Sequence, residues 1–193
     1  EWLGVRESQP EQASLRGAVY LRTLRTESAE ATVAVIGVTT SLMKDMTVKG
    51  RTDGFVFPSE VETVEKILGQ LPPVDLVVLL THCGLSKDEE LAKAFQGRVN
   101  VIVGGHSHTR LDDGRREGNV LIAQAGCNSQ RLGRVTVSLE PPRSSGSRAG
   151  RPVVSSKAEL LLVGDDIHAR FGSYLRTVEK KVGLPPGGLE RAG

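Results

Sequence analysis

The sequence predicts an α/β fold, a layered sandwich in which helices flank a mixed, largely parallel sheet. Three apolar runs rich in β-branched residues alternate with two segments of helical periodicity, the pattern of parallel strands joined by right-handed helical crossovers. The chain of 193 residues carries 22 Gly but only one Trp, two Tyr and four Phe. This composition suits an aliphatic core served by many tight turns, and the length allows one domain with a sizeable core.

The first strands and a loop come from the amino-terminal third. Residues 32–40 form a near-continuous β-branched run, which predicts a strand buried on both faces of the sheet. A weaker strand pattern precedes it at 18–24. Residues 41–58 are polar and lack periodicity, so we expect a long loop there.

Two helices and two further strands follow. Each helix is predicted to begin at a Ser-x-x-Glu capping box, the first at Ser59 and the second at Ser86. The first helix ends before the prolines at 72–73. The apolar runs 74–80 and 99–103 follow the two helices and predict the second and third parallel strands.

The remaining third predicts smaller elements. Residues 119–125 and 131–140 look like two strands that pair with each other, antiparallel, at one edge of the sheet. Residues 141–152 contain only Pro, Gly, Ser, Ala and Arg, which is typical of a flexible loop or linker. Beyond it we expect strand-like segments at 153–154 and 160–163 and a last helix that begins at Asp165.

Composition excludes several classes of protein. The net charge is only +2 and the Arg residues are scattered, so nothing indicates a nucleic-acid or anionic-membrane partner. No apolar run approaches the roughly 20 residues that span a bilayer. We expect Cys83 and Cys127 to be small packing residues, with a bridge between them as the alternative.

Three of the four His residues lie at the ends of predicted parallel strands. His82 follows one strand, and His106 and His108 follow the next. Open α/β sheets bind ligands at the carboxyl ends of their strands, so we expect the three imidazoles to converge. If residues 104–109 are extended, His106 and His108 face one side and Ser107 the other.

Convergent imidazoles indicate a transition-metal site, for which zinc, manganese, iron, nickel and copper are candidates. Gly104 and Gly105 would let the backbone approach that site closely. The alternative is a strand-end His followed by a polar loop. The other polar candidates are interpreted as solvated or helix-terminal residues: Asp88, Arg110, Arg115, Arg116, Asn128 and His168.

Two segments carry a recognisable pattern, with residues 77–84 reading VVLLTHCG and residues 101–109 reading VIVGGHSHT. The strand at 33–40 and the segment from Gln124 to Gly133 add to it. Over residues 18 to 140 the chain resembles the calcineurin-like metallophosphoesterases, in particular their bacterial 5′-nucleotidase branch, which also hydrolyses 2′,3′-cyclic nucleotides. The resemblance implies a small-molecule phosphate ester, in particular a nucleotide, as substrate.

The resemblance further implies two divalent metal ions, Zn, Mn or Fe, between two stacked sheets, with a bridging hydroxide that attacks phosphorus. By motif, His82 and His106 would bind one metal and His108 the other; no catalytic or substrate-binding residue is assigned. Similar nucleotidases are commonly exported, which implies a periplasmic or extracellular location.

The chain also departs from that family. The motifs that the family carries earlier in the domain, Asp-x-His, Gly-Asp and Asn-His, are missing from residues 1–73. These residues contain neither His nor Asn. We therefore expect residues 1–140 to be the second half of a metallophosphoesterase domain that needs an upstream half-domain and is inactive alone. Residues 141–152 would be a flexible loop or linker, and 153–193 would lead toward a further domain.

Two alternatives remain open. The chain could be a non-catalytic metal-binding or interaction module derived from the same fold. A mononuclear metal hydrolase is the weaker option, because no acidic residue near the three His is placed as a base, and Asp88 is explained by its place in the first turn of a helix.

Overall fold

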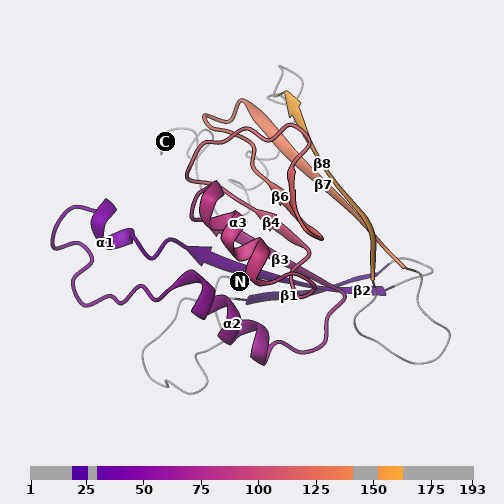
Figure 1. The fold of residues 1–193 in the computed structure, drawn as a ribbon, viewed down its shortest axis with the longest axis horizontal. Helices are drawn as coiled ribbons and strands as arrows, with labels where there is room; N and C mark the ends of the chain where they lie inside the picture. Colours follow the sequence, from indigo (N-terminus) through magenta and orange to yellow (C-terminus); the bar gives the residue numbers. More distant parts are fainter. Residues whose placement is uncertain (1–18, 26–29, 141–151, 163–193) are drawn as a thin grey trace, which may run out of the picture.

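The computed structural model describes residues 19–25, 30–140 and 152–162. They form a six-stranded sheet of order β1-β2-β3-β4-β6-β5 and a separate two-stranded ribbon of β7 and β8 (Figure 1). The strands are β1 (Val19–Arg25), β2 (Glu30–Thr39), β3 (Leu76–His82), β4 (Val101–Val103), β5 (Arg115–Glu117), β6 (Val120–Ala123), β7 (Arg131–Leu139) and β8 (Val153–Leu162). The helices are α1 (Met43–Met46), α2 (Glu60–Gln70) and α3 (Leu85–Ala94).

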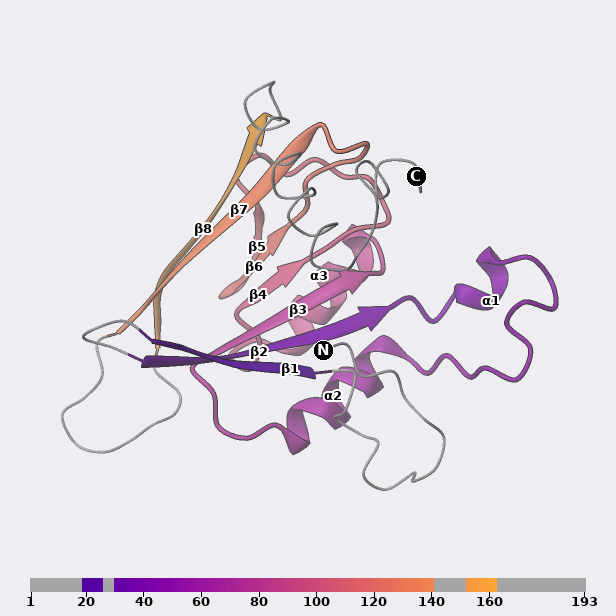
Figure 2. The same ribbon diagram turned by 180° about the vertical axis from the view of Figure 1, so that it is seen from behind.

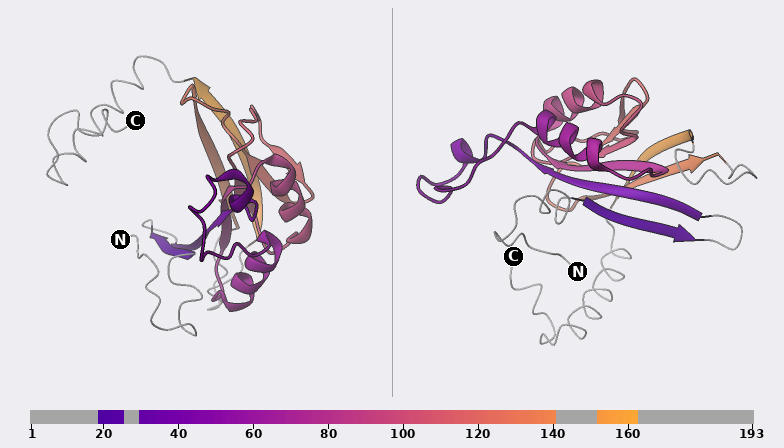
Figure 3. Two further views of the ribbon diagram at one scale, coloured as in Figure 1. Left: turned by 90° about the vertical axis from the view of Figure 1, so that its left-hand side faces the viewer. Right: turned by 90° about the horizontal axis from the view of Figure 1, so that it is seen from below.

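The sheet is mixed and largely parallel, as the sequence predicts. Strands β2, β3, β4 and β6 run parallel, and β1 and β5 are antiparallel strands at the two edges (Figure 2). Helices α2 and α3 are the crossovers from β2 to β3 and from β3 to β4, and both cover the same face (Figure 3). Both crossovers move along the sheet in the same direction and have the same handedness, so their helices lie on the same face of the sheet.

The expectation that β2 is buried on both faces is wrong. Ala34, Ile36 and Val38 are buried toward the helices, whereas Val35 is half-buried and Gly37 is exposed. Alternate residues of a strand point to opposite faces, and the described helices cover only one of them. A run of apolar residues therefore does not by itself show burial on both sides.

The other face is covered at one end by the β7–β8 ribbon. Ala158 of β8 and Val135 of β7 pack on Leu121 and Ala123 of β6. Since Val120 and Ile122 lie in the main core on the helix side, all four residues of β6 are buried. The sheet is thus sandwiched around β6 and open to solvent on this face around Leu80 of β3, whose exposed fraction is 48%.

The predicted pairing of the strands around 119–125 and 131–140 is also wrong. Strand β6 continues the parallel sheet beside β4, and β7 pairs with β8 instead. Strand β8 is continuous where the sequence suggested two short segments, because it pairs with β7 along its whole length. The short edge strand β5, rich in Arg, was not predicted.

Both predicted helices form, but the two capping boxes do not. Ser59 is the N-cap of α2 without a side-chain cap hydrogen bond. Helix α3 begins at Leu85 with Gly84, at a φ of 87°, as its N-cap, two residues before the predicted cap Ser86. The backbone N–H of Leu85 donates to Oγ of Ser107 at 3.1 Å, so a loop distant in sequence caps this helix.

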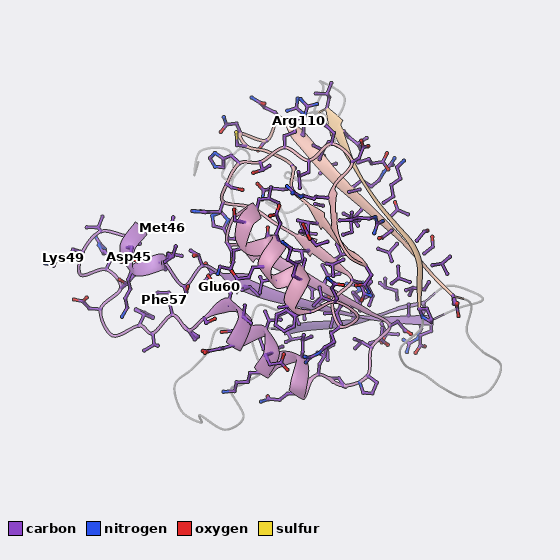
Figure 4. The ribbon with its side chains drawn as sticks, in the orientation of Figure 1. Asp45, Met46, Lys49, Phe57, Glu60 and Arg110 are labelled. Carbon is purple, nitrogen blue, oxygen red and sulfur yellow. The ribbon has the colours of Figure 1, made fainter. Side chains whose placement is uncertain are left out.

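Residues 41–59 form an arm that projects from the body and contains the short helix α1 (Figure 1). Figure 4 shows Met46 and Lys49 on the arm and Glu60 at its base. The buried carboxylate of Glu60 accepts hydrogen bonds from the backbone N–H of Ser41, at 2.7 Å, and from its hydroxyl, at 3.1 Å. Burial raises the pKa of Glu60, but these bonds outweigh it and lower the pKa, so the ionised carboxylate closes the base of the arm.

The predicted helix from Asp165, with His168, lies outside the described residues. Within the described ranges, no helix is long and apolar enough to cross a membrane.

Candidate metal centre

The structure brings His82 and His106 together. His82 is the last residue of β3, and His106 lies three residues after the end of β4, the neighbouring parallel strand. Their ring centroids are 5.2 Å apart and the rings meet edge to face, at 70°. His82 is exposed and His106 is half-buried, so the pair sits at the surface edge where the carboxyl ends of the strands meet.

The third predicted ligand, His108, lies in the same loop and is exposed. Among the residues that the structure describes, no three His, Cys, Asp or Glu side chains form a group that could hold a metal ion. Two of the three imidazoles are thus placed side by side, and the metal ligation of all three stays a prediction.

The loop is not extended, so the alternation argument for it is wrong. His106 has a φ of 78° and His108 a φ of 56°, both in the left-handed region that side chains rarely adopt. The N–H of Ser107 donates to the carbonyl of Gly105 at 3.0 Å, which makes a tight turn. Such strained positions persist only where the surrounding structure holds them in place, and they cluster at functional sites.

Gln124 is the residue that holds this turn, and sequence reasoning missed it. Its side-chain oxygen accepts hydrogen bonds from the Ser107 hydroxyl, at 2.9 Å, and from the N–H of Thr109, at 2.5 Å. Its Nε2 donates to the carbonyl of Gly105 at 3.3 Å. Gln124 directly follows β6, a parallel strand, so the rule that singled out the His residues also applies to it.

Gly104 and Gly105 both lie where a side chain would collide with a neighbouring element. A Cβ on Gly105 would lie 3.1 Å from Nδ1 of His82, and a Cβ on Gly104 would lie 2.1 Å from Oδ2 of Asp88. The first contact is tight and the second is impossible without movement. Glycine at both positions therefore lets the loop backbone pass directly over β3 and α3.

Asp88 is in the first turn of α3, as expected, but its environment is unusual. The side chain is fully buried, and Oδ1 accepts a hydrogen bond from the Thr81 hydroxyl at 2.6 Å. Oδ2 has no hydrogen-bond partner among the residues that the structure describes. Burial raises the pKa of Asp88 to about 6, against the lowering effect of the Thr81 bond. Its position at a helix N-terminus alone does not explain a buried carboxyl.

The arginines near the loop are engaged elsewhere. Arg110 forms an ion pair with Asp112, and Arg115 forms one with Glu89, at 2.7 and 2.8 Å. Arg116 donates to the backbone carbonyl and hydroxyl of Ser156. Asn128 is exposed in the turn before β7. All four are surface groups, as expected.

Both cysteines are free, so the bridge does not form. Cys83 packs against the main core, and burial raises the pKa of its thiol to about 11. A thiol with this pKa is protonated at neutral pH and is a poor metal ligand.

The described donor set is smaller than a metal centre needs. Catalytic zinc sites commonly use three protein ligands and an open position, and structural sites use four. His82 and His106 supply two imidazoles of the right chemistry. The described residues therefore fit part of a metal centre and do not complete one.

The chain is similar in sequence to known phosphoesterases over part of its length. No protein-family model matches the chain. It is 35% identical over 114 residues to the trifunctional nucleotide phosphoesterase protein YfkN of Bacillus subtilis, which covers 56% of this chain and 8% of YfkN. It is 28% identical over 149 residues to the snake venom 5′-nucleotidase of Crotalus adamanteus, over 65% of this chain and 24% of that protein. The chain thus spans a quarter or less of these relatives.

Solved structures share the fold. The calcineurin-like phosphoesterase YfkN from Bacillus subtilis superposes with a TM-score of 0.59 at 16% identity, over 77% of this chain and 51% of that one. A sulfate thiohydrolase, SoxB of Thermus thermophilus, superposes with a TM-score of 0.62 at 22% identity, over 86% of this chain and 30% of that one. In sequence the chain is similar to a nucleotide phosphoesterase and a 5′-nucleotidase, and it shares the fold of the calcineurin-like phosphoesterase YfkN.

Proposed function

We propose that this chain is part of a metal-dependent phosphoesterase that hydrolyses nucleotides or related phosphate esters. The observation that supports it is the His82–His106 pair at the ends of adjacent parallel strands, in a chain similar to a nucleotide phosphoesterase and a 5′-nucleotidase. The substrate class comes from these relatives. The location we propose, periplasmic or extracellular, comes from the same resemblance.

The centre we propose is dinuclear, with His82 and His106 on one cation and His108 on the other. Two divalent cations, Zn, Mn or Fe, would neutralise the charge that develops on a phosphoryl group and lower the pKa of water. The described residues supply only part of the ligands, so we propose that an upstream half-domain supplies the rest. Residues 1–140 would then be the second half of the catalytic domain, 141–152 a flexible loop or linker, and 153–193 the connection to a further domain.

Hydrolysis assays test this proposal. AMP, 2′,3′-cyclic AMP and bis(p-nitrophenyl) phosphate are offered with Mn²⁺ or Zn²⁺ to this chain and to the complete protein that contains it. We expect turnover only by the complete protein, and a loss of roughly 100-fold, about 2.7 kcal/mol of barrier, in its His82→Ala and His106→Ala variants. Glu65→Gln, which removes a carboxylate exposed on α2 and paired with Arg98, is the control and should leave turnover unchanged.

The outcomes separate the parts of the proposal. Turnover by this chain alone would show that its centre is complete. A complete protein that hydrolyses p-nitrophenyl sulfate and no phosphate ester would contradict the substrate class, a relevant comparison because SoxB shares the fold.

The alternative is a non-catalytic metal-binding or interaction module. It is favoured by the finding that no group of three potential ligands exists among the described residues. A complete protein that binds Zn²⁺ through His82 and His106 but hydrolyses none of these esters would support it.

A further inference from the structure

Asp88 connects the two segments that carry the His pair. Its Oδ1 accepts the hydrogen bond from the hydroxyl of Thr81, the residue that precedes His82 on β3. Its Oδ2 lies against the backbone of Gly104, two residues before His106, where a Cβ would come within 2.1 Å. One carboxyl group thus touches both sides of the pair from a third element, α3.

The burial of this group needs an explanation other than stability. Asp88 has an exposed fraction of 0%, and Oδ2 has no hydrogen-bond partner among the described atoms. An unpaired buried carboxyl oxygen costs free energy that an apolar side chain would not. Thr81 is itself only 5% exposed, so water does not satisfy the group from that side.

We infer that Asp88 is a positioning residue, which holds the end of β3 and the Gly104–Gly105 turn at a fixed separation and so sets the spacing of His82 and His106. Hydrogen-bonding to Thr81 fixes the carboxyl on one side. Steric contact with Gly104 limits how closely the turn approaches on the other. The inference rests on the proposed function only in that His82 and His106 would serve there as metal ligands.

Ring geometry in the whole chain tests the inference directly. NMR of the uniformly ¹³C,¹⁵N-labelled chain measures the contact between the His82 and His106 rings as a cross-peak. We expect Asp88→Ala to abolish this cross-peak and shift both ring signals, while cross-strand contacts of β7 and β8 persist. Asp88→Asn keeps the shape and the acceptor for Thr81, so it should restore the cross-peak.

Asp75→Ala is the matched control. Asp75 is also a buried carboxylate, 7% exposed, and accepts a hydrogen bond from the N–H of Thr32 at 2.8 Å. It directly precedes β3, whereas His82 ends that strand. We expect Asp75→Ala to change stability and leave the two rings in contact.

The remaining outcomes are also decisive. An unchanged ring contact in Asp88→Ala overturns the inference. If that variant does not fold, Thr81→Val, which removes the donor hydroxyl and keeps the side-chain shape, replaces it: displaced rings support the inference and unmoved rings overturn it. Because no hydrolysis is measured, a failure of the proposed phosphoesterase activity leaves this result intact, and a negative ring result leaves the activity untouched.

Discussion

At the scale of single residues, the buried Asp88 makes stability depend on pH. Burial raises its pKa from 3.8 to about 6, so between these values the native state binds more protons than the unfolded state. The contribution of Asp88 to the free energy of unfolding is therefore greatest below pH 3.8 and decreases as the pH rises to about 6, by roughly 2 to 3 kcal/mol. Asp88→Asn removes this decrease.

Urea unfolding of the wild type and of Asp88→Asn at pH 4, 5, 6 and 7 measures the difference. The variant should gain stability relative to the wild type across that interval. Glu65→Gln, an exposed carboxylate on α2, should follow the wild type. Parallel curves for wild type and Asp88→Asn would show that the Asp88 pKa is not raised.

The residues of the site differ in how far sequence could predict them. His82, His106 and the two glycines were predictable because a motif and a strand end coincide there. Gln124 and the burial of Asp88 were not, because both depend on contacts between different elements, 7 to 19 positions apart along the chain. The sequence pattern of an acidic residue in the first turn of a helix is the same whether its side chain faces solvent or the core.

At the scale of elements, β3 shows why periodicity alone misjudges burial. Leu79 has an exposed fraction of 0% and Leu80 one of 48%, although they are adjacent in one apolar run. Leu79→Ala should lower the free energy of unfolding by about 2 to 5 kcal/mol, because it leaves a cavity under the helices. Leu80→Ala should cost less than about 1 kcal/mol in this chain.

Chemical denaturation of the two variants measures these costs, and each serves as the other's control. Equal losses would mean that the face of β3 opposite the helices is also covered.

Element positions were predicted better than element partners. Helical periodicity located α2 and α3, and β-branched runs located β2, β3 and β4 to within a few residues. The pairing of β7 with β8 was not predictable, since strands joined by a low-complexity segment give no local sign of their register. The prediction of the N-cap of α3 was wrong for the same reason, because the hydroxyl of Ser107, 22 residues away in sequence, accepts the hydrogen bond at the start of the helix.

At the scale of the whole molecule, the β7–β8 ribbon is attached to the sheet through a small apolar contact with β6 and the hydrogen bonds of Arg116 to Ser156. Ala158 is 2% exposed and packs on Leu121 and Ala123. Ala158→Asp would bury an unpaired carboxylate there at a cost of several kcal/mol. We expect the ribbon to separate from β6 while the parallel sheet persists.

Hydrogen exchange measures this separation as lost protection in β7, β8 and β6 with retained protection in β2 and β3. Val154→Asp is the control on the same strand, because Val154 is 64% exposed and should tolerate the charge. Protection lost equally throughout the sheet would instead show that ribbon and sheet unfold as one unit.

The sequence by itself determined the α/β class, the order of its main elements and the three His at strand ends, because those features depend on local composition and on motifs. Only the tertiary structure decided which face of the sheet is covered, which strands pair, and that His82 and His106 meet while Asp88 lies buried behind them. These are matters of distance between segments far apart in the chain. Their physical cause is packing: a strand exposes two faces, and what folds onto each of them decides burial.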